Sequence, residues 1–230
     1  MWFGMVATTI YHMNRVGIGV LTFVFVVIAV AGCGAGRTTV ATSTADPGAP
    51  PSIPVTAQQI DSLLLPLDEI NRLTGAGLTA VDPKKDRPAD AAQSASEQPS
   101  APCFVVDAGT GDVATYGRDW TAFRSVYSTA GRNSGIVQNI GVYPSDSAAR
   151  AAFDRWVKSV TACKNSGAES GMQLAVSPDA VDYSHSYTYG DLATSGRIVG
   201  SVLITVDVSP DQAWSSPVAD KIAAKLKSPV

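Results

Sequence analysis

The sequence is poor in the residues that build metal sites and nucleic-acid surfaces. Its 230 residues contain two histidines and three cysteines, without a CxxC pair or paired histidines, so we expect neither a metal site nor a cofactor. Lys and Arg form no rich tract and the formal net charge is -3, whereas nucleic-acid-binding proteins carry a basic patch. These absences exclude nucleic acid from the expected partners and leave membranes, small molecules and other proteins.

One long apolar run, residues 16–31, lies near the N-terminus and ends in small residues before Cys33. Its length suits the apolar region of a signal peptide. The stretch VAGC at residues 30–33 resembles the lipobox of bacterial lipoproteins, which reads Leu or Val, a small residue, Gly or Ala, then Cys. The resemblance implies cleavage before Cys33 and acylation of its sulfur, for example with palmitate. An uncleaved transmembrane anchor is the alternative, and both export the rest of the chain.

Three parts of the chain follow from this signal. Residues 1–32 are the expected signal peptide, and Met13 is the expected true start because a basic residue follows it and the preceding segment is neutral. Residues 33–55 are rich in Thr, Ser, Ala and Pro, and such a segment buries too little apolar surface to fold. We therefore expect a flexible, lipid-anchored linker and a folded domain at residues 56–230, on the outer face of the cytoplasmic membrane.

The cysteines add a constraint on the folded domain. If Cys33 carries lipid, Cys103 and Cys163 remain as a pair in an oxidising compartment. A disulfide between them is the prediction. Two separate buried thiols are the alternative.

Three segments have the spacing of apolar residues that is typical of helices. In the first, at residues 66–74, a proline suits the first turn and a following glycine suits the end. The second has Ser145 as N-cap and ends near Cys163. Its apolar stripe contains Trp156, which we expect in the core rather than in a ligand platform. The third lies within residues 210–227 and has two lysines in its last turn.

Strand patterns and turn clusters separate these helices. Predicted strands cover residues 77–81, 119–129, 136–143, 171–177, 181–190 and 197–208. The second and third of them form a hairpin around a glycine-containing turn. Residues 82–102 are polar and predict a long exposed loop, and residues 109–117 are rich in turn formers. The order of elements predicts an α+β fold, a single domain with an antiparallel sheet flanked by helices.

One face of the strand at residues 181–190 is the candidate ligand-binding surface. Alternation places three tyrosines and the histidine of the folded domain on this face, namely Tyr183, His185, Tyr187 and Tyr189. Mixed aromatic and polar groups are typical of small-molecule pockets. The alternative is that this face packs under a helix.

The motifs resemble a known family when they are taken in order. The segment LLLPLDEIN at residues 63–71 resembles the opening of the PknH-like extracellular sensor domain of mycobacteria. Further similar segments are YG at 116–117, WTAFR at 120–124, YPS at 143–145, AC at 162–163 and IAAK at 222–225. The resemblance covers about residues 59–227. It implies a sheet flanked by helices with a ligand cleft, either in a receptor kinase or in a free-standing lipoprotein.

The chain also departs from the kinase-linked members of this family. The resemblance implies two disulfides in those members, and this chain matches only Cys103–Cys163. A second pair would fall near residues 189–193 and near Asp207, where no cysteine is present. The sequence shows no glycine-rich phosphate loop, His-Arg-Asp motif or Asp-Phe-Gly motif of a kinase.

We therefore predict a non-enzymatic, lipid-anchored binding or sensor domain for a small molecule, a glycan or an envelope protein. A structural lipoprotein that docks a partner without a small ligand is the first alternative. A hydrolase is the second, with His185 oriented by Asp182 or Asp191, or with a pair of carboxylates acting on a glycoside. No Gly-x-Ser-x-Gly motif marks a nucleophile for it.

Overall fold

The structure is a computed structural model that describes residues 55–56, 58–88, 103–106, 112–131, 134–187 and 190–227. These residues fall within a unit that spans residues 50–230. The expected signal peptide, Met13, Cys33 and all of the linker but its last residue lie outside the described residues. Among the helices that the structure describes, none has the length and hydrophobicity needed to cross a bilayer.

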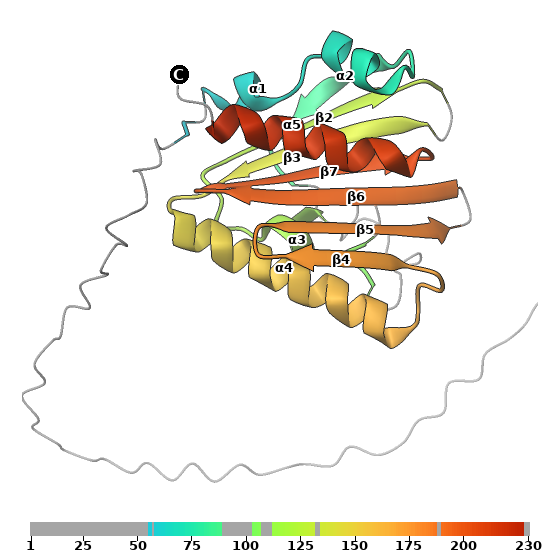
Figure 1. Cartoon of the computed structure of the whole chain (residues 1–230). Helices are drawn as coiled ribbons and strands as arrows, with labels where there is room; N and C mark the ends of the chain where they lie inside the picture. The colour runs from blue at the N-terminus through green and yellow to red at the C-terminus, as the bar shows by residue number, and fades with distance from the viewer. Residues whose placement is uncertain are drawn as a thin grey trace, which may run out of the picture. The chain divides into compact units, whose positions relative to one another are not determined.

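An antiparallel sheet of seven strands forms the centre of the domain, in the order β1-β2-β3-β7-β6-β5-β4 (Figure 1). The strands are β1 (Thr79–Lys85), β2 (Ala122–Thr129), β3 (Gly135–Val142), β4 (Gln173–Ser177), β5 (Ala180–Tyr187), β6 (Gly190–Val199) and β7 (Val202–Ser209). Every neighbouring pair is antiparallel. The predicted α+β class, with an antiparallel sheet flanked by helices, is confirmed.

The predicted hairpin is present as β2 and β3. Their register is unbroken from Ala122 opposite Val142 to Thr129 opposite Gly135. Both strands carry β-branched and aromatic side chains, which pack well on a pleated surface.

The predicted single strand at residues 197–208 is wrong, because the chain turns within it. Strand β6 ends at Val199 and β7 begins at Val202, so a two-residue turn of Gly200 and Ser201 joins them. Gly200 has a φ of 56°, a left-handed conformation that glycine adopts without a steric penalty. The apolar run hid this turn from the strand pattern, and four strands rather than three follow the long helix.

Two other segments also differ from the prediction. Strand β1 continues to Lys85, so the polar loop does not begin at residue 82 as expected; its residues 89–102 lie outside the described chain. The segment predicted to be turns contains α3 (Asp112–Tyr116). This helix has only five residues, too few to show helical periodicity, and its buried Tyr116 contacts the sheet.

The first two predicted helices are both present, with bounds close to the predicted ones. Helix α2 (Leu67–Thr74) follows Pro66 and ends at Gly75, whose φ is 68°. Helix α4 (Asp146–Ser166) begins at Ser145, whose hydroxyl accepts a hydrogen bond from the backbone N–H of Ala148. The other described helices are the short α1 (Ile60–Leu63), the 3-10 turn η2 (Gln212–Trp214) and α5 (Ser215–Lys227).

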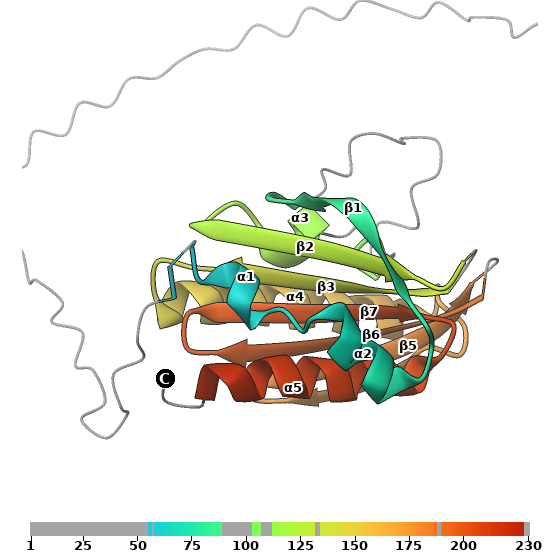
Figure 2. The same ribbon diagram turned by 90° about the horizontal axis from the view of Figure 1, so that it is seen from above.

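The helices cover both faces of the sheet and create two hydrophobic layers. Helices α1, α2 and α5 pack on one face, here called the α5 face, and α3 and α4 pack on the other, the α4 face (Figure 2). The α5 face buries mainly aliphatic residues, whereas the α4 face buries several aromatic ones. Trp156 of α4 is 1% exposed and belongs to the core, as predicted.

Trp156 packs directly over a glycine of the sheet. A Cβ atom at Gly196 of β6 would lie 2.1 Å from Cζ3 of Trp156. No real Cβ makes such a contact, so glycine at this position lets α4 lie close to the sheet.

Two polar anchors hold the segment between α1 and α2, which carries the motif LLLP. The amide of Gln138 on β3 pairs with Leu65, accepting from its N–H at 2.9 Å and donating to its C=O at 3.2 Å. The ammonium of Lys225 on α5 donates to the C=O of Leu64 at 2.9 Å. Buried backbone groups require such partners, so these side chains fix where the first helices pack.

Cys103 and Cys163 form a disulfide in the structure, which is the pairing expected from the cysteine count. It joins a short turn at residues 103–106 to the last turn of α4 across a sequence separation of 60 residues. Both cysteines are fully buried in the core of the α4 face. The link therefore holds the segment before α3 against α4.

Candidate functional site

A cluster of polar side chains lies on the α4 face of the three central strands. It consists of Tyr116, Asn139, Thr194, Thr205 and Asp207, here called the Asp207 cluster. Strand register brings the members together, since Asn139 lies opposite Thr205 and Thr194 lies opposite Asp207. All but Asp207 are buried, and Asp207 is half-buried.

Side-chain hydrogen bonds connect the cluster across β3, β7 and β6. Asp207 accepts from the hydroxyl of Thr194 at 2.7 Å and from the amide of Asn139 at 3.1 Å. The same amide nitrogen lies 3.1 Å from Oγ1 of Thr205. The phenol oxygen of Tyr116 lies 3.0 Å from that Oγ1 and 3.1 Å from the C=O of Asn139. The network fixes the position of the Asp207 carboxyl.

The environment of Asp207 raises the pKa of its carboxyl toward neutral pH. Burial raises the pKa of the Asp207 carboxyl from 3.8 to about 7. The hydrogen bonds from Thr194 and Asn139 lower the pKa, and the negative charge of Asp112 in α3 raises it. Carboxyl groups with a pKa raised in this way cluster at functional sites, which makes Asp207 a candidate.

Tyr116 contributes a neutral hydroxyl to the cluster. Burial raises the pKa of its phenol well above 10, so the group remains protonated at physiological pH. The ring packs edge-on against Phe123 with 5.0 Å between centroids, and the backbone C=O accepts from the hydroxyl of Tyr143 at 2.8 Å. The short helix α3 is thus held against β2 and β3.

Asn139 carries an acceptor that the fold does not satisfy. Its side chain is 1% exposed, and its Oδ1 atom has no hydrogen-bond partner. Unsatisfied buried polar atoms are rare and point to an ion, a water or a ligand group that completes the site. The Oδ1 atom of Asn139 is therefore the acceptor of the cluster that is left without a donor among the described residues.

The comparisons with known proteins decide the family. The family model described as the PknH-like extracellular domain matches residues 55–225. The chain belongs to the PknH-like extracellular domains. The crystal structure of the extracellular domain of PknH from Mycobacterium tuberculosis has the same fold, with a TM-score of 0.58 and 15% sequence identity over 76% of this chain and 98% of that one. No curated protein matches the sequence significantly.

The family agrees with the expected export, since its members are extracellular domains. The resemblance placed a second disulfide of kinase-linked members near residues 189–193 and near Asp207. In this PknH-like domain the hydrogen bond from Thr194 to Asp207 connects the corresponding strands.

The face of β5 that the sequence singles out lies on the same side of the sheet as the Asp207 cluster. Tyr183 is opposite Thr194, but its side chain is only 5% exposed and its ring lies 6.2 Å from that of Trp156. His185 is 3% exposed. Tyr183 is thus positioned as in the alternative in which the face packs under a helix, and His185 is buried as well. The side chain of Tyr187 and all of Tyr189 lie outside what the structure describes.

The residues considered for a hydrolase are separated in this PknH-like domain. His185 lies opposite Leu192 on the α4 face, whereas Asp191 lies opposite Ser186 on the α5 face. Asp182 also projects from the α5 face, where it accepts a hydrogen bond from Arg197 at 2.9 Å. Neither aspartate orients the imidazole as a Ser-His-Asp arrangement requires. The described residues contain no group of three His, Cys, Asp or Glu that could hold a metal.

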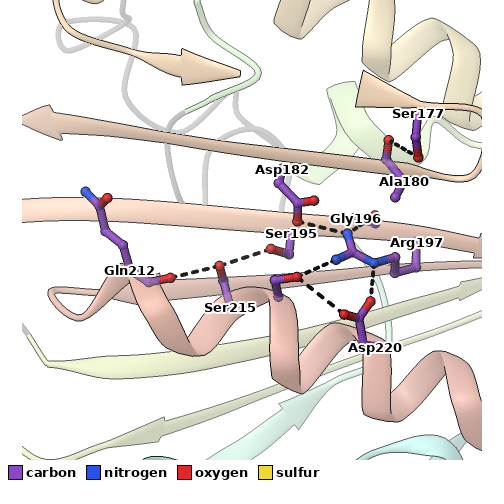
Figure 3. A network of polar contacts seen from close by, with 10 residues as sticks. Ser177, Ala180, Asp182, Ser195, Gly196, Arg197, Gln212, Ser215 and Asp220 are labelled. Atoms are coloured by element: carbon purple, nitrogen blue, oxygen red, sulfur yellow. Dashed lines mark hydrogen bonds and ion pairs between the residues drawn. The ribbon is translucent and has the colours of Figure 1, made fainter. Parts of the chain in front are cut away.

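Arg197 organises a second polar network, on the α5 face (Figure 3). Its guanidinium donates to Asp220 at 2.6 Å, to Asp182 at 2.9 Å, to the C=O of Gly196 at 2.7 Å and to the hydroxyl of Ser216 at 2.7 Å. Burial lowers the pKa of Arg197, and the two aspartates more than offset this effect. This network joins β5 and β6 to α5, and its charges satisfy one another.

The sequence pattern of any one strand does not predict the Asp207 cluster, because its members come from three strands and a short helix. The available signal was the polar residues within otherwise apolar strands, Asn139 in IVQNIGV and Thr205 and Asp207 in VLITVDV. A polar side chain at a core position requires partners, and those partners come from distant parts of the chain.

Proposed function

We propose that this PknH-like domain is a lipid-anchored, non-enzymatic binding or sensor domain on the outer face of the cytoplasmic membrane. The family supports the extracytoplasmic location, and the lipobox-like sequence before Cys33 supports the anchor. The separation of His185 from Asp182 and Asp191 supports a role in binding rather than catalysis.

The Asp207 cluster is the observation that carries this proposal. It combines a half-buried carboxyl that titrates near neutral pH with a buried amide oxygen that has no partner. Such a site favours a ligand that brings hydrogen-bond donors, whether a small molecule, a glycan or a side chain of an envelope protein. The Arg197 network is less suited to be the primary site, because its charged groups are already paired.

Native mass spectrometry of the full chain, exported and purified in detergent, tests the proposal. The wild-type protein is expected to retain a reproducible extra mass that is lost on unfolding. Asp207→Asn, which keeps the shape but removes the charge, is expected to retain much less of it. Asp68→Asn is the matched control, because that carboxylate lies on the exposed surface of α2. Equal retention by the two variants, or a bare wild-type chain, would contradict a ligand at Asp207.

Docking of an envelope protein without a small ligand is the second candidate function. The edge strand β4 favours it, because Val176 is 49% exposed and the strand carries neither a charge nor a proline that would discourage pairing. A photo-cross-linking residue at position 176, in cells, would capture such a partner. A residue placed at exposed Leu73 is the control.

A further inference from the structure

A groove on the α5 face is a candidate binding site separate from the Asp207 cluster. It lies between strands β4 to β6 and the segment from η2 into α5, and it encloses about 460 Å³. Small-molecule sites commonly have volumes of about 300–1,000 Å³. Its polar lining includes Asp182, Ser184, Ser195, Gln212 and Ser216.

The end of the groove beside Arg197 carries a net negative charge. One guanidinium faces two carboxylates, Asp182 and Asp220, and the side chain of Arg197 is only 10% exposed. An anion would meet carboxylates rather than a free positive charge. The groove is therefore poorly suited to phosphate or sulfate, although serine hydroxyls line it.

Three groups of the lining remain able to bind a ligand. The side chain of Asp182 is 39% exposed, and only its Oδ1 is engaged, by Arg197. In the described part of the chain, the hydroxyl of Ser184 and the side-chain amide of Gln212 make no hydrogen bond. Figure 3 shows the side-chain amide of Gln212 pointing away from Ser215, which is bonded to the backbone oxygen of Gln212. Together they offer donors and acceptors to one space.

The small residues of the groove add a flat apolar surface. Ala175, Ala193 and Ala213 line it together with the polar groups. Short methyl side chains allow the C–H face of a ring to approach while its hydroxyls reach the polar groups.

We propose that this groove binds a neutral polyhydroxylated ligand, such as a sugar or a cyclitol. A hydroxyl both donates and accepts hydrogen bonds, which matches a lining of carboxylate, amide and hydroxyl groups without net positive charge. The carboxylate accepts from the ligand, the Gln212 amide does both, and Ser184 completes the contact. This site is independent of the ligand proposed for Asp207, which lies on the other face of the sheet.

Saturation-transfer NMR on the full chain in detergent tests this site. The probes are glucose, mannose and myo-inositol, and inorganic phosphate, observed by phosphorus NMR, is the anionic comparison. At least one hydroxylated probe is expected to bind, and the double variant Ser184→Ala with Gln212→Ala is expected to weaken that binding about tenfold, as the loss of two hydrogen bonds implies. Phosphate is expected not to bind in the groove.

Two checks keep the result interpretable. The double variant should unfold at the wild-type urea concentration, because neither side chain has an internal hydrogen bond to lose. Ser177→Ala, at the end of β4 and outside the groove lining, is the matched control and should bind as the wild type does. The proposal is overturned if no hydroxylated probe binds, if the double variant binds as well as the wild type, or if phosphate binds in a manner that the double variant abolishes.

Discussion

At the scale of single residues, Asp207 makes the stability of the domain depend on pH. Its pKa is about 7 in the folded state and 3.8 ordinarily, so the folded state holds the proton more tightly than the unfolded chain does. Stability contributed by this proton is complete below about pH 4 and is lost as the pH rises through about 7. We predict that Asp207→Asn gains stability relative to the wild type as the pH rises from 5 to 8.

Urea unfolding of the wild type and Asp207→Asn at pH 5, 6, 7 and 8 measures this difference. Comparing the two proteins at each pH removes the contribution of the other titrating groups. Asp68→Asn, on the exposed surface of α2, should follow the wild type at all four values. A difference between the wild type and Asp207→Asn that does not change with pH would show that burial does not perturb this carboxyl.

Gly196 is a second residue whose role the structure defines. Alanine there would place Cβ 2.1 Å from the ring of Trp156, so α4 must move away from the sheet. Overpacking of this kind costs about 1–3 kcal/mol, and sometimes more. We predict that Gly196→Ala lowers the free energy of unfolding by at least about 2 kcal/mol, measured with urea.

The double variant Gly196→Ala with Trp156→Leu provides the control for this clash. The smaller side chain leaves room for the new methyl group, so the two changes together should cost less than their sum. Additive effects would mean that Gly196 matters for another reason, such as the conformation of β6.

At the scale of elements, the disulfide holds the segment before α3 to the end of α4. A loop closed over 60 residues stabilises by about 4 kcal/mol in the chain-entropy model. We predict a loss of that order in the double variant Cys103→Ala with Cys163→Ala, from urea unfolding. A reducing agent should lower the stability of the wild type and leave the double variant unchanged. A wild type that is indifferent to reduction would contradict this role.

The elements also show which structures local sequence encodes. Helices α2 and α4 carry boundary residues of their own, Pro66 and Gly75 for α2 and Ser145 for the start of α4, so their sequences were sufficient to predict them. Helix α3 was missed because five residues show no periodicity, and it is held by contacts of Tyr116 with β3 and β7. The β6–β7 turn was missed because apolar residues flank the pair Gly200 and Ser201 on both sides.

At the scale of the whole molecule, Cys33 is the proposed attachment to the membrane. We predict that the mature protein incorporates a palmitate analogue and that its N-terminal peptide is an acylated Cys33 when analysed by mass spectrometry. Cys33→Ser should lose the label and migrate as the longer, uncleaved precursor, because the cysteine is the acceptor of the lipid. Two or more acyl chains give stable anchoring, which one chain does not.

An uncleaved transmembrane anchor, the alternative, predicts a different result when the sizes and the labelling of the two proteins are compared on a gel. An uncleaved transmembrane helix would give wild type and Cys33→Ser the same size and no label in either. Label that persists in Cys33→Ser would place the acyl chain elsewhere.

Much of the fold followed from the sequence, whereas the candidate site did not. The alternation on β5 indicated the face of the sheet that also carries the Asp207 cluster, but it selected Tyr183 and His185, which are buried side chains. The Asp207 cluster depends on the register between β3, β7 and β6. It also depends on Tyr116, which lies 89 residues before Thr205 in the sequence. These side chains meet only in the tertiary structure. The pairing register of strands that are distant in the chain cannot be predicted from one sequence alone.

The most direct test of the account is a titration of the Asp207 carboxyl carbon by NMR in the full chain. We predict a midpoint near pH 7, because burial raises the pKa of this group and Asp112 adds to the effect. We also predict a lower midpoint in Asp112→Asn, which removes that negative charge. A midpoint near 4 in the wild type would show an ordinary, solvated surface carboxylate and would contradict the Asp207 cluster as the functional site.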